Sequence, residues 1–123
     1  MFDVLIVDDD ADTARMLLRL VKHQGYGGEC ASNGHAALER LAADPLPKLV
    51  ILDQMMPGIE GIEVLRRLRA QPRTAAIRVV IFSANANPAF EEQVAAEGAD
   101  AFWPKANIDY SKIGSLIEEA LAA

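Results

Sequence analysis

The fold is decided by residues 4–10, whose sequence is VLIVDDD. Its first part, Val4–Val7, is a short apolar and mostly β-branched run without polar alternation. Such a run is typical of a strand that is buried on both faces of a parallel sheet. Three consecutive aspartates, Asp8–Asp10, come directly after it. The strand therefore ends in carboxylates, and the ends of the other predicted strands indicate which groups lie beside them.

Similar apolar runs recur along the chain at Leu49–Leu52 and Val79–Phe82. Glu29–Ser32 and Ala101–Trp103 are weaker candidates for two further strands. Between these runs, apolar residues recur at helical spacing. The expected helices carry Ala14, Leu17, Leu18 and Val21; Ala37, Leu38 and Leu41; Ile62, Leu65 and Leu68; Phe90 and Val94; and Ile113, Leu116, Ile117 and Ala120.

Capping residues give the limits of several of these helices. The expected N-caps are Asp10, Asn33, Asn87 and Ser111, because short polar side chains accept hydrogen bonds from the first-turn amides. Pro88 suits the first helical position. Gly25 and Gly98 end the first and fourth helices, and Pro45 ends the second.

Strands that alternate with helices predict an α/β fold, a doubly wound parallel sheet covered by helices on both faces. The chain has 123 residues, which suits one domain over residues 1–123. With 51% hydrophobic and 24% charged residues, its composition is that of a globular protein. In open sheets of this class, ligands bind beyond the carboxyl ends of the strands.

Charge and cysteine content exclude several partners and locations. The net charge of −6 argues against direct DNA or other nucleic-acid binding. No apolar run reaches the roughly 18 residues that a membrane span needs. The single cysteine, Cys30, cannot form an internal disulfide, and we expect it to be buried in the second strand. These features predict a cytoplasmic protein, with a monomer or weak dimer as the default.

The predicted strand ends bring together three kinds of chemistry. Carboxylates come from Asp8–Asp10 and Asp53, a hydroxyl from Ser83 and an ammonium from Lys105. Clustered carboxylates repel one another unless a cation joins them. Mg²⁺ suits such an oxygen site because it keeps several waters and shares its coordination with phosphate. An aspartate can attack phosphorus to form an aspartyl phosphate, with the metal and a lysine neutralising charge.

Four segments together resemble the receiver domain of two-component response regulators, of the single-domain chemotaxis type. They are Val4–Asp10 (VLIVDDD), Leu49–Gly61 (LVILDQMMPGIEG), Val79–Ala84 (VVIFSA) and Gly98–Lys105 (GADAFWPK). The resemblance covers the whole chain, in order and at the spacing of the family. It implies a flavodoxin-like (βα)5 fold with the strand order 2-1-3-4-5.

The resemblance also implies an acceptor and a metal site. Asp53 would accept the phosphoryl group from a histidine kinase or a phosphotransfer protein. Asp8, Asp9 and Asp53 would hold Mg²⁺, together with the backbone carbonyl of Met55. Only self-phosphorylation from a donor and slow loss of the group are expected, so the protein is not expected to be an enzyme.

The remaining implied roles concern the phosphoryl group and the switch. Ser83, the backbone of Ala84 and Lys105 would contact the phosphoryl group, and the Phe102 ring would turn inward when Ser83 moves. The main departure from the family pattern follows the lysine: the family usually has a proline there, joined by a cis bond, and here Ala106 follows Lys105. Either this loop carries a cis bond that costs about 3 kcal/mol or it takes another path.

Three functions remain open at this point. The first is a stand-alone receiver that signals through protein contacts, since no output segment follows the last predicted helix. The second is a degenerate receiver that acts as an unphosphorylated docking module. The third is an Mg²⁺-dependent phosphatase with an aspartate nucleophile, although Met55 stands where such enzymes typically carry a second aspartate. A basic cluster of Arg66, Arg67, Arg69 and Arg73 is either a solvated face or a docking site for an acidic partner.

Overall fold

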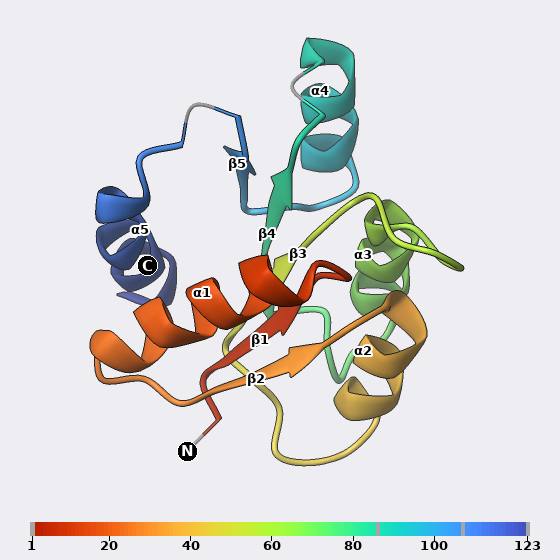
Figure 1. The fold of residues 1–123 in the computed structure, drawn as a ribbon. Coiled ribbons are helices and arrows are strands. Elements are labelled where there is room, and N and C mark those ends of the chain that lie inside the picture. The colour runs from red at the N-terminus through yellow and green to blue at the C-terminus, as the bar shows by residue number, and fades with distance from the viewer. Residues whose placement is uncertain (1, 86, 107, 123) are drawn as a thin grey trace.

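The computed structural model describes residues 2–85, 87–106 and 108–122. Within these residues the chain forms a five-stranded parallel sheet with the order β2-β1-β3-β4-β5 (Figure 1). The strands are β1 (Val4–Val7), β2 (Gly28–Ala31), β3 (Leu49–Leu52), β4 (Arg78–Ser83) and β5 (Ala101–Pro104). This order confirms the doubly wound fold, and every strand lies within two residues of its predicted limits.

Helices cover both faces of this sheet, as the fully apolar strands require. They are α1 (Ala11–His23), α2 (Gly34–Leu41), α3 (Gly61–Ala70), α4 (Pro88–Ala96), the 3-10 turn η1 (Tyr110–Lys112) and α5 (Ile113–Ala122). Successive residues of β1 face opposite ways: Leu5 and Val7 pack with α2, α3 and α4, whereas Val4 and Ile6 pack with α1 and α5. The two cores therefore share one central sheet, and they leave its strand ends free for chemistry.

Three of the four predicted N-caps are confirmed. The side chains of Asp10, Asn33 and Asn87 accept hydrogen bonds from first-turn amides of α1, α2 and α4. The prediction for Ser111 was wrong, because Asp109 takes that role and accepts hydrogen bonds from the Ser111 amide and hydroxyl. A 3-10 turn directly precedes α5, so the helical segment begins at Tyr110, one residue before Ser111.

Two other expectations need correction. Helix α2 ends at Leu41, before Pro45. Cys30 lies in β2 as predicted, but it is exposed rather than buried. Because β2 is an edge strand, α1 shields only one side of Cys30, whose Sγ lies 3.7 Å from the Ala14 carbonyl oxygen.

Candidate functional site

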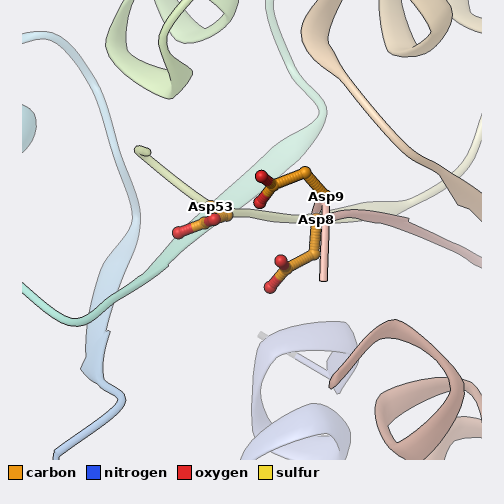
Figure 2. Close-up of side chains that lie close together, drawn as sticks. All are labelled: Asp8, Asp9 and Asp53. Atoms are coloured by element: carbon orange, nitrogen blue, oxygen red, sulfur yellow. The ribbon is translucent and has the colours of Figure 1, made fainter. Parts of the chain in front are cut away.

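The acidic site forms where two paired strands end together. Strands β1 and β3 are parallel neighbours with Val7 opposite Leu52, and the Asp53 amide donates to the Val7 carbonyl at 2.9 Å. Asp8 and Asp53 are therefore the next residues on adjacent strands. Asp8, Asp9 and Asp53 each offer a carboxylate oxygen, and these oxygens lie within 4.8 Å of one another (Figure 2). The structure thus brings together all three predicted acidic metal ligands.

The three carboxylates differ in exposure. Asp8 and Asp53 are 3% and 5% exposed, whereas Asp9 is open to solvent. The Asp10 amide donates to Asp8 Oδ1 at 2.9 Å, which orients the Asp8 carboxylate at the start of α1. The cluster is therefore buried at Asp8 and Asp53 and accessible to solvent at Asp9.

Lys105 reaches this cluster from the end of β5. Its Nζ lies 2.8 Å from Asp8 Oδ2 and 3.4 Å from Asp53 Oδ1. Within the described residues, the cis peptide bond is the one that precedes Pro45, so the Lys105–Ala106 bond is trans. Of the two paths considered for this loop, the structure has the one without a cis bond. The ammonium still lies between the two buried carboxylates.

The charge state of the site is governed by this burial. Desolvation by burial, followed by the charge of Asp8, raises the pKa of Asp53 above its usual value, although Lys105 and the Met55 amide act in the opposite direction. Burial works to lower the pKa of Lys105, but the hydrogen bond to Asp8 and the charge of Asp53 outweigh it and the pKa is raised. Lys105 therefore remains a cation at neutral pH, whereas the surroundings of Asp53 disfavour the negative charge of its carboxylate.

Ser83, Ala84 and Phe102 lie on the neighbouring strands β4 and β5 or just after them. Ser83 is fully buried at the end of β4, and its Oγ accepts a hydrogen bond from the Asn85 amide at 3.1 Å. Ala84 follows it and is exposed. The Phe102 ring is half-buried and packs edge-on against Phe90 of α4, with ring centroids 5.9 Å apart. Phe102 thus links β5 to α4.

One buried polar residue in this region was not predicted. Gln54 follows Asp53 and is 6% exposed. Its Oε1 accepts a hydrogen bond from the Ile62 amide at 2.7 Å, and its Nε2 donates to Glu60 Oε2 at 3.0 Å. A sequence signal did exist, because the residue before α3 is Glu60, a poor N-cap that makes no side-chain capping bond here.

The basic cluster of α3 is largely neutralised by acids. Arg66 pairs with Glu63 and Glu97, Arg67 with Glu63, Arg69 with Asp100, and Arg73 with Asp44. Arg69 also donates to the carbonyls of Ala75, Ile77 and Gly98, so it joins α3 to the segment before β4 and to the loop before β5. This pairing favours the solvated face over an acidic docking partner, with Arg69 as a structural cross-link.

Comparison with known proteins identifies this arrangement. The family model described as "Response regulator receiver domain" matches residues 4–117. The chain belongs to the response regulator receiver domain family. Curated relatives include the response regulator MprA of Mycolicibacterium vanbaalenii and of Mycobacterium tuberculosis strain H37Ra, each 38% identical over 104 residues, or 83% of this chain. The chain spans 43% of the length of these relatives.

Solved structures agree with the receiver fold. A putative response regulator from Chloroflexus aurantiacus superimposes with a TM-score of 0.89 at 27% identity and covers 99% of this receiver and 98% of that chain. The chemotaxis response regulator CheY4 of Vibrio cholerae has a TM-score of 0.88 at 23% identity, with 98% and 99% covered, and it supports the fold. The chain is thus a receiver of two-component signalling.

The site of this receiver suits a hard cation. Receiver domains bind Mg²⁺ at an acidic pocket, and here Asp8, Asp9 and Asp53 supply a set of oxygen donors at one strand edge. Mg²⁺ prefers a site with a small number of protein oxygens, where water and phosphate can complete its shell. This cluster has a small number of such oxygens and is open to solvent. Among the residues that the structure describes, no helix has the length and apolar character needed to cross a membrane.

Proposed function

We propose that the chain, as one domain over residues 1–123, accepts a phosphoryl group on Asp53 in a two-component phosphorelay. The observation that carries this proposal is the position of Lys105 between Asp8 and Asp53 in an otherwise acidic cluster. A partly buried cation beside a nucleophilic carboxylate suits phosphoryl transfer, because the reaction depends on positioning and on charge neutralisation.

The reaction transfers one phosphoryl group from a phosphohistidine of a kinase or phosphotransfer protein. A carboxylate oxygen of Asp53 attacks phosphorus, the bond from phosphorus to the imidazole nitrogen breaks, and its electron pair stays on the imidazole. Asp53 is held with its backbone bonded to β1, so its carboxylate is fixed at the strand edge. The pKa of this buried carboxyl is raised because its ionised form is destabilised by the surroundings. A bound cation, or a bond to phosphorus, would relieve that destabilisation.

Other residues around Asp53 would bind the metal ion and the phosphoryl group. Asp8 and Asp9, with Asp53 and the Met55 carbonyl, would hold Mg²⁺, which would supply positive charge for the phosphoryl oxygens. Lys105 would pair with the same group. The Ser83 hydroxyl and the Ala84 backbone amide would donate to it.

A conformational change would result from these contacts. A Ser83 hydroxyl that turns to the phosphoryl group gives up its bond with the Asn85 amide. The half-buried Phe102 ring packs on α4 through Phe90, so a rearrangement of β4 can reach α4 through this ring pair. We propose that phosphorylation favours one of two arrangements that already exist, and that protein contacts read the difference.

Phosphate-affinity gels test the acceptor directly. The protein is incubated with acetyl phosphate and Mg²⁺, alongside the Asp53→Asn variant and the matched control Asp44→Asn, whose carboxylate lies at the surface in an ion pair with Arg73. A slower band in wild type and in Asp44→Asn, absent in Asp53→Asn and absent with EDTA, is expected. A band that persists in Asp53→Asn would contradict the proposal.

The degenerate receiver is the main alternative, and Ala106, which stands where the family usually has a proline, is the residue that favours it. Since Lys105 reaches both carboxylates without a proline after it, that departure no longer argues against phosphorylation. The phosphatase alternative lacks its general acid, because Met55 exposes a thioether side chain where a carboxyl is needed. A cytoplasmic location, a monomer or weak dimer, and the absence of direct DNA binding stay predictions.

A further inference from the structure

The first turn of α3 is capped by the residue that follows the proposed acceptor. The first amides of a helix lack intrahelical partners, and here Gln54 satisfies two of them. Its carbonyl oxygen accepts from the Gly61 amide at 3.1 Å, and its side-chain Oε1 accepts from the Ile62 amide at 2.7 Å. The amides of Glu63 and Val64 donate to the Glu60 carbonyl. Gln54 therefore performs the role of an N-cap from a distance of several residues.

The side-chain nitrogen of Gln54 restrains the loop between β3 and α3. Gln54 Nε2 donates to Glu60 Oε2 at 3.0 Å, so one buried amide bridges the end of β3 and the residue before α3. Residues 55–59 lie between these two anchors. A buried amide with both of its polar atoms bonded fixes its neighbours, because breaking either bond would leave a desolvated polar group.

This bridge lies directly against the acidic cluster. A Cβ atom added to Gly61 would collide with the carbonyl oxygen of Asp53, so the start of α3 packs on the backbone of the proposed acceptor. The backbone amide of Met55 also faces the Asp53 carboxylate. Movement of the loop at Met55 would thus change both the position of a proposed metal ligand and the environment of Asp53.

We propose that Gln54 is a positioning residue for the metal site. It holds the Asp53–Glu60 loop to α3 so that the Met55 carbonyl stays in place as a ligand for a divalent cation beside Asp53. The inference rests on the proposed function, because it assumes that Asp8, Asp9, Asp53 and Met55 bind Mg²⁺. It extends that function by assigning Mg²⁺ affinity to a residue that contacts neither the metal nor the phosphoryl group.

Isothermal titration with MgCl₂ tests the assignment on the folded protein without any phosphoryl donor. Gln54→Met keeps an unbranched side chain but removes both hydrogen bonds, and we expect it to weaken Mg²⁺ binding by about tenfold, as supporting residues around metal ligands do. The matched control is Thr74→Val, which removes the buried hydrogen bond from Thr74 Oγ1 to the Leu68 carbonyl near the other end of α3. This control should bind Mg²⁺ like wild type.

An exchange of the two polar partners gives a second readout. In Gln54→Glu, the introduced carboxylate can still accept from the Ile62 amide but repels Glu60, so Mg²⁺ binding should weaken. When Gln54→Glu is combined with Glu60→Gln, the introduced amide at position 60 can donate to the introduced carboxylate at position 54, and the net charge equals that of wild type. We expect the double variant to regain wild-type Mg²⁺ affinity within about twofold.

The outcomes separate this inference from the function on which it rests. If wild type binds Mg²⁺ and Gln54→Met binds it equally well, the positioning role is wrong and the proposed function stands. Equal weakening in Gln54→Met and Thr74→Val would also overturn the role, because it would reflect lost stability alone. Absence of Mg²⁺ binding in wild type would overturn both. Should Gln54→Met fail to fold, the exchange decides, and a double variant no better than Gln54→Glu would refute the inference.

Discussion

The ammonium of Lys105 lies 2.8 Å from Asp8 Oδ2, although the residue after the lysine is alanine and the bond between them is trans. Strand pairing explains this position. Ser83 stands opposite Pro104 in the β4–β5 ladder, and the Lys105 amide donates to the Ser83 carbonyl at 2.8 Å. Lys105 is thus placed by the residues before it, and its reach does not depend on a proline at position 106.

Removal of this ammonium should destabilise the protein most when no metal is present. Lys105→Met leaves Asp8 and Asp53 buried side by side without a cation, and we expect a loss of about 2 kcal/mol in the free energy of unfolding. Added Mg²⁺ should recover part of that loss, because it supplies the missing charge. Urea unfolding with MgCl₂ or with EDTA measures both values. Lys48→Met, at an exposed lysine, is the control, and an equal loss there would contradict the account.

Loss of the Asp53 charge should have the opposite effect on stability. Because burial raises the folded pKa of Asp53 above its usual value of 3.8, the native state binds this proton more tightly than the unfolded chain. The free energy of unfolding therefore falls as pH rises from 3.8 through the raised folded pKa, and the ionised carboxylate destabilises the protein at neutral pH.

Asp53→Asn should accordingly be more stable than wild type at pH 7 in EDTA, by on the order of 1 kcal/mol or a few degrees in Tm. The advantage should shrink toward acidic pH, where the carboxyl is protonated in the folded and the unfolded chain alike, and it should also shrink in MgCl₂. Thermal unfolding across this pH range measures the difference. A variant less stable than wild type at neutral pH without metal would show that the carboxylate is not under electrostatic strain.

Cys30 should be open to thiol reagents in the folded protein, because it lies exposed on the edge strand β2. Partial burial raises its pKa above the usual value of 9.0, so the reactive thiolate is scarce at neutral pH. We expect iodoacetamide to modify it several-fold more slowly than a free cysteine at about pH 7.5, with the rate rising toward about pH 9. Mass spectrometry follows the reaction. Labelling only after addition of urea would show that the thiol is buried.

Arg69 and Arg67 lie on the same helix, and their substitution should give very different results. Arg69 donates to three backbone carbonyls and to Asp100, whereas Arg67 forms an exposed ion pair with Glu63. Arg69→Met should lower the free energy of unfolding by about 2 kcal/mol, because the partly buried carbonyls of Ile77 and Gly98 lose their donors. Arg67→Met should change it by less than about 0.5 kcal/mol. Urea denaturation compares them, and similar losses would contradict the structural role of Arg69.

The sequence predicted the sheet and the acidic cluster well because both depend on local patterns. Apolar runs such as Val4–Val7 indicate buried strands, and parallel topology then places Asp8 and Asp53 at one edge. The predicted end of the fifth strand also places Lys105 at this edge. Whether it reaches Asp8 depends on the path of the loop after β5, which the residue types alone do not specify.

Other features depend on contacts that sequence spacing does not encode. Gln54 caps α3 through a side chain that crosses the loop. The poor N-cap Glu60 indicates that α3 needs another capping group, but the residue types do not identify Gln54 as that group. The prediction for Cys30 was wrong because it followed the usual burial of this residue type, although the order 2-1-3-4-5 already placed its strand at an edge. Ser111 was misjudged because Asp109 initiates a 3-10 turn first.

The central claim is that Asp53 carries the phosphoryl group, and chemical trapping of the acyl phosphate tests it most directly. After incubation with acetyl phosphate and Mg²⁺, borohydride reduces an aspartyl phosphate to homoserine, and tandem mass spectrometry locates that residue in the chain. The account predicts homoserine at position 53 and its absence when EDTA replaces Mg²⁺. Homoserine at another aspartate, or none under conditions in which Mg²⁺ is bound, would contradict it.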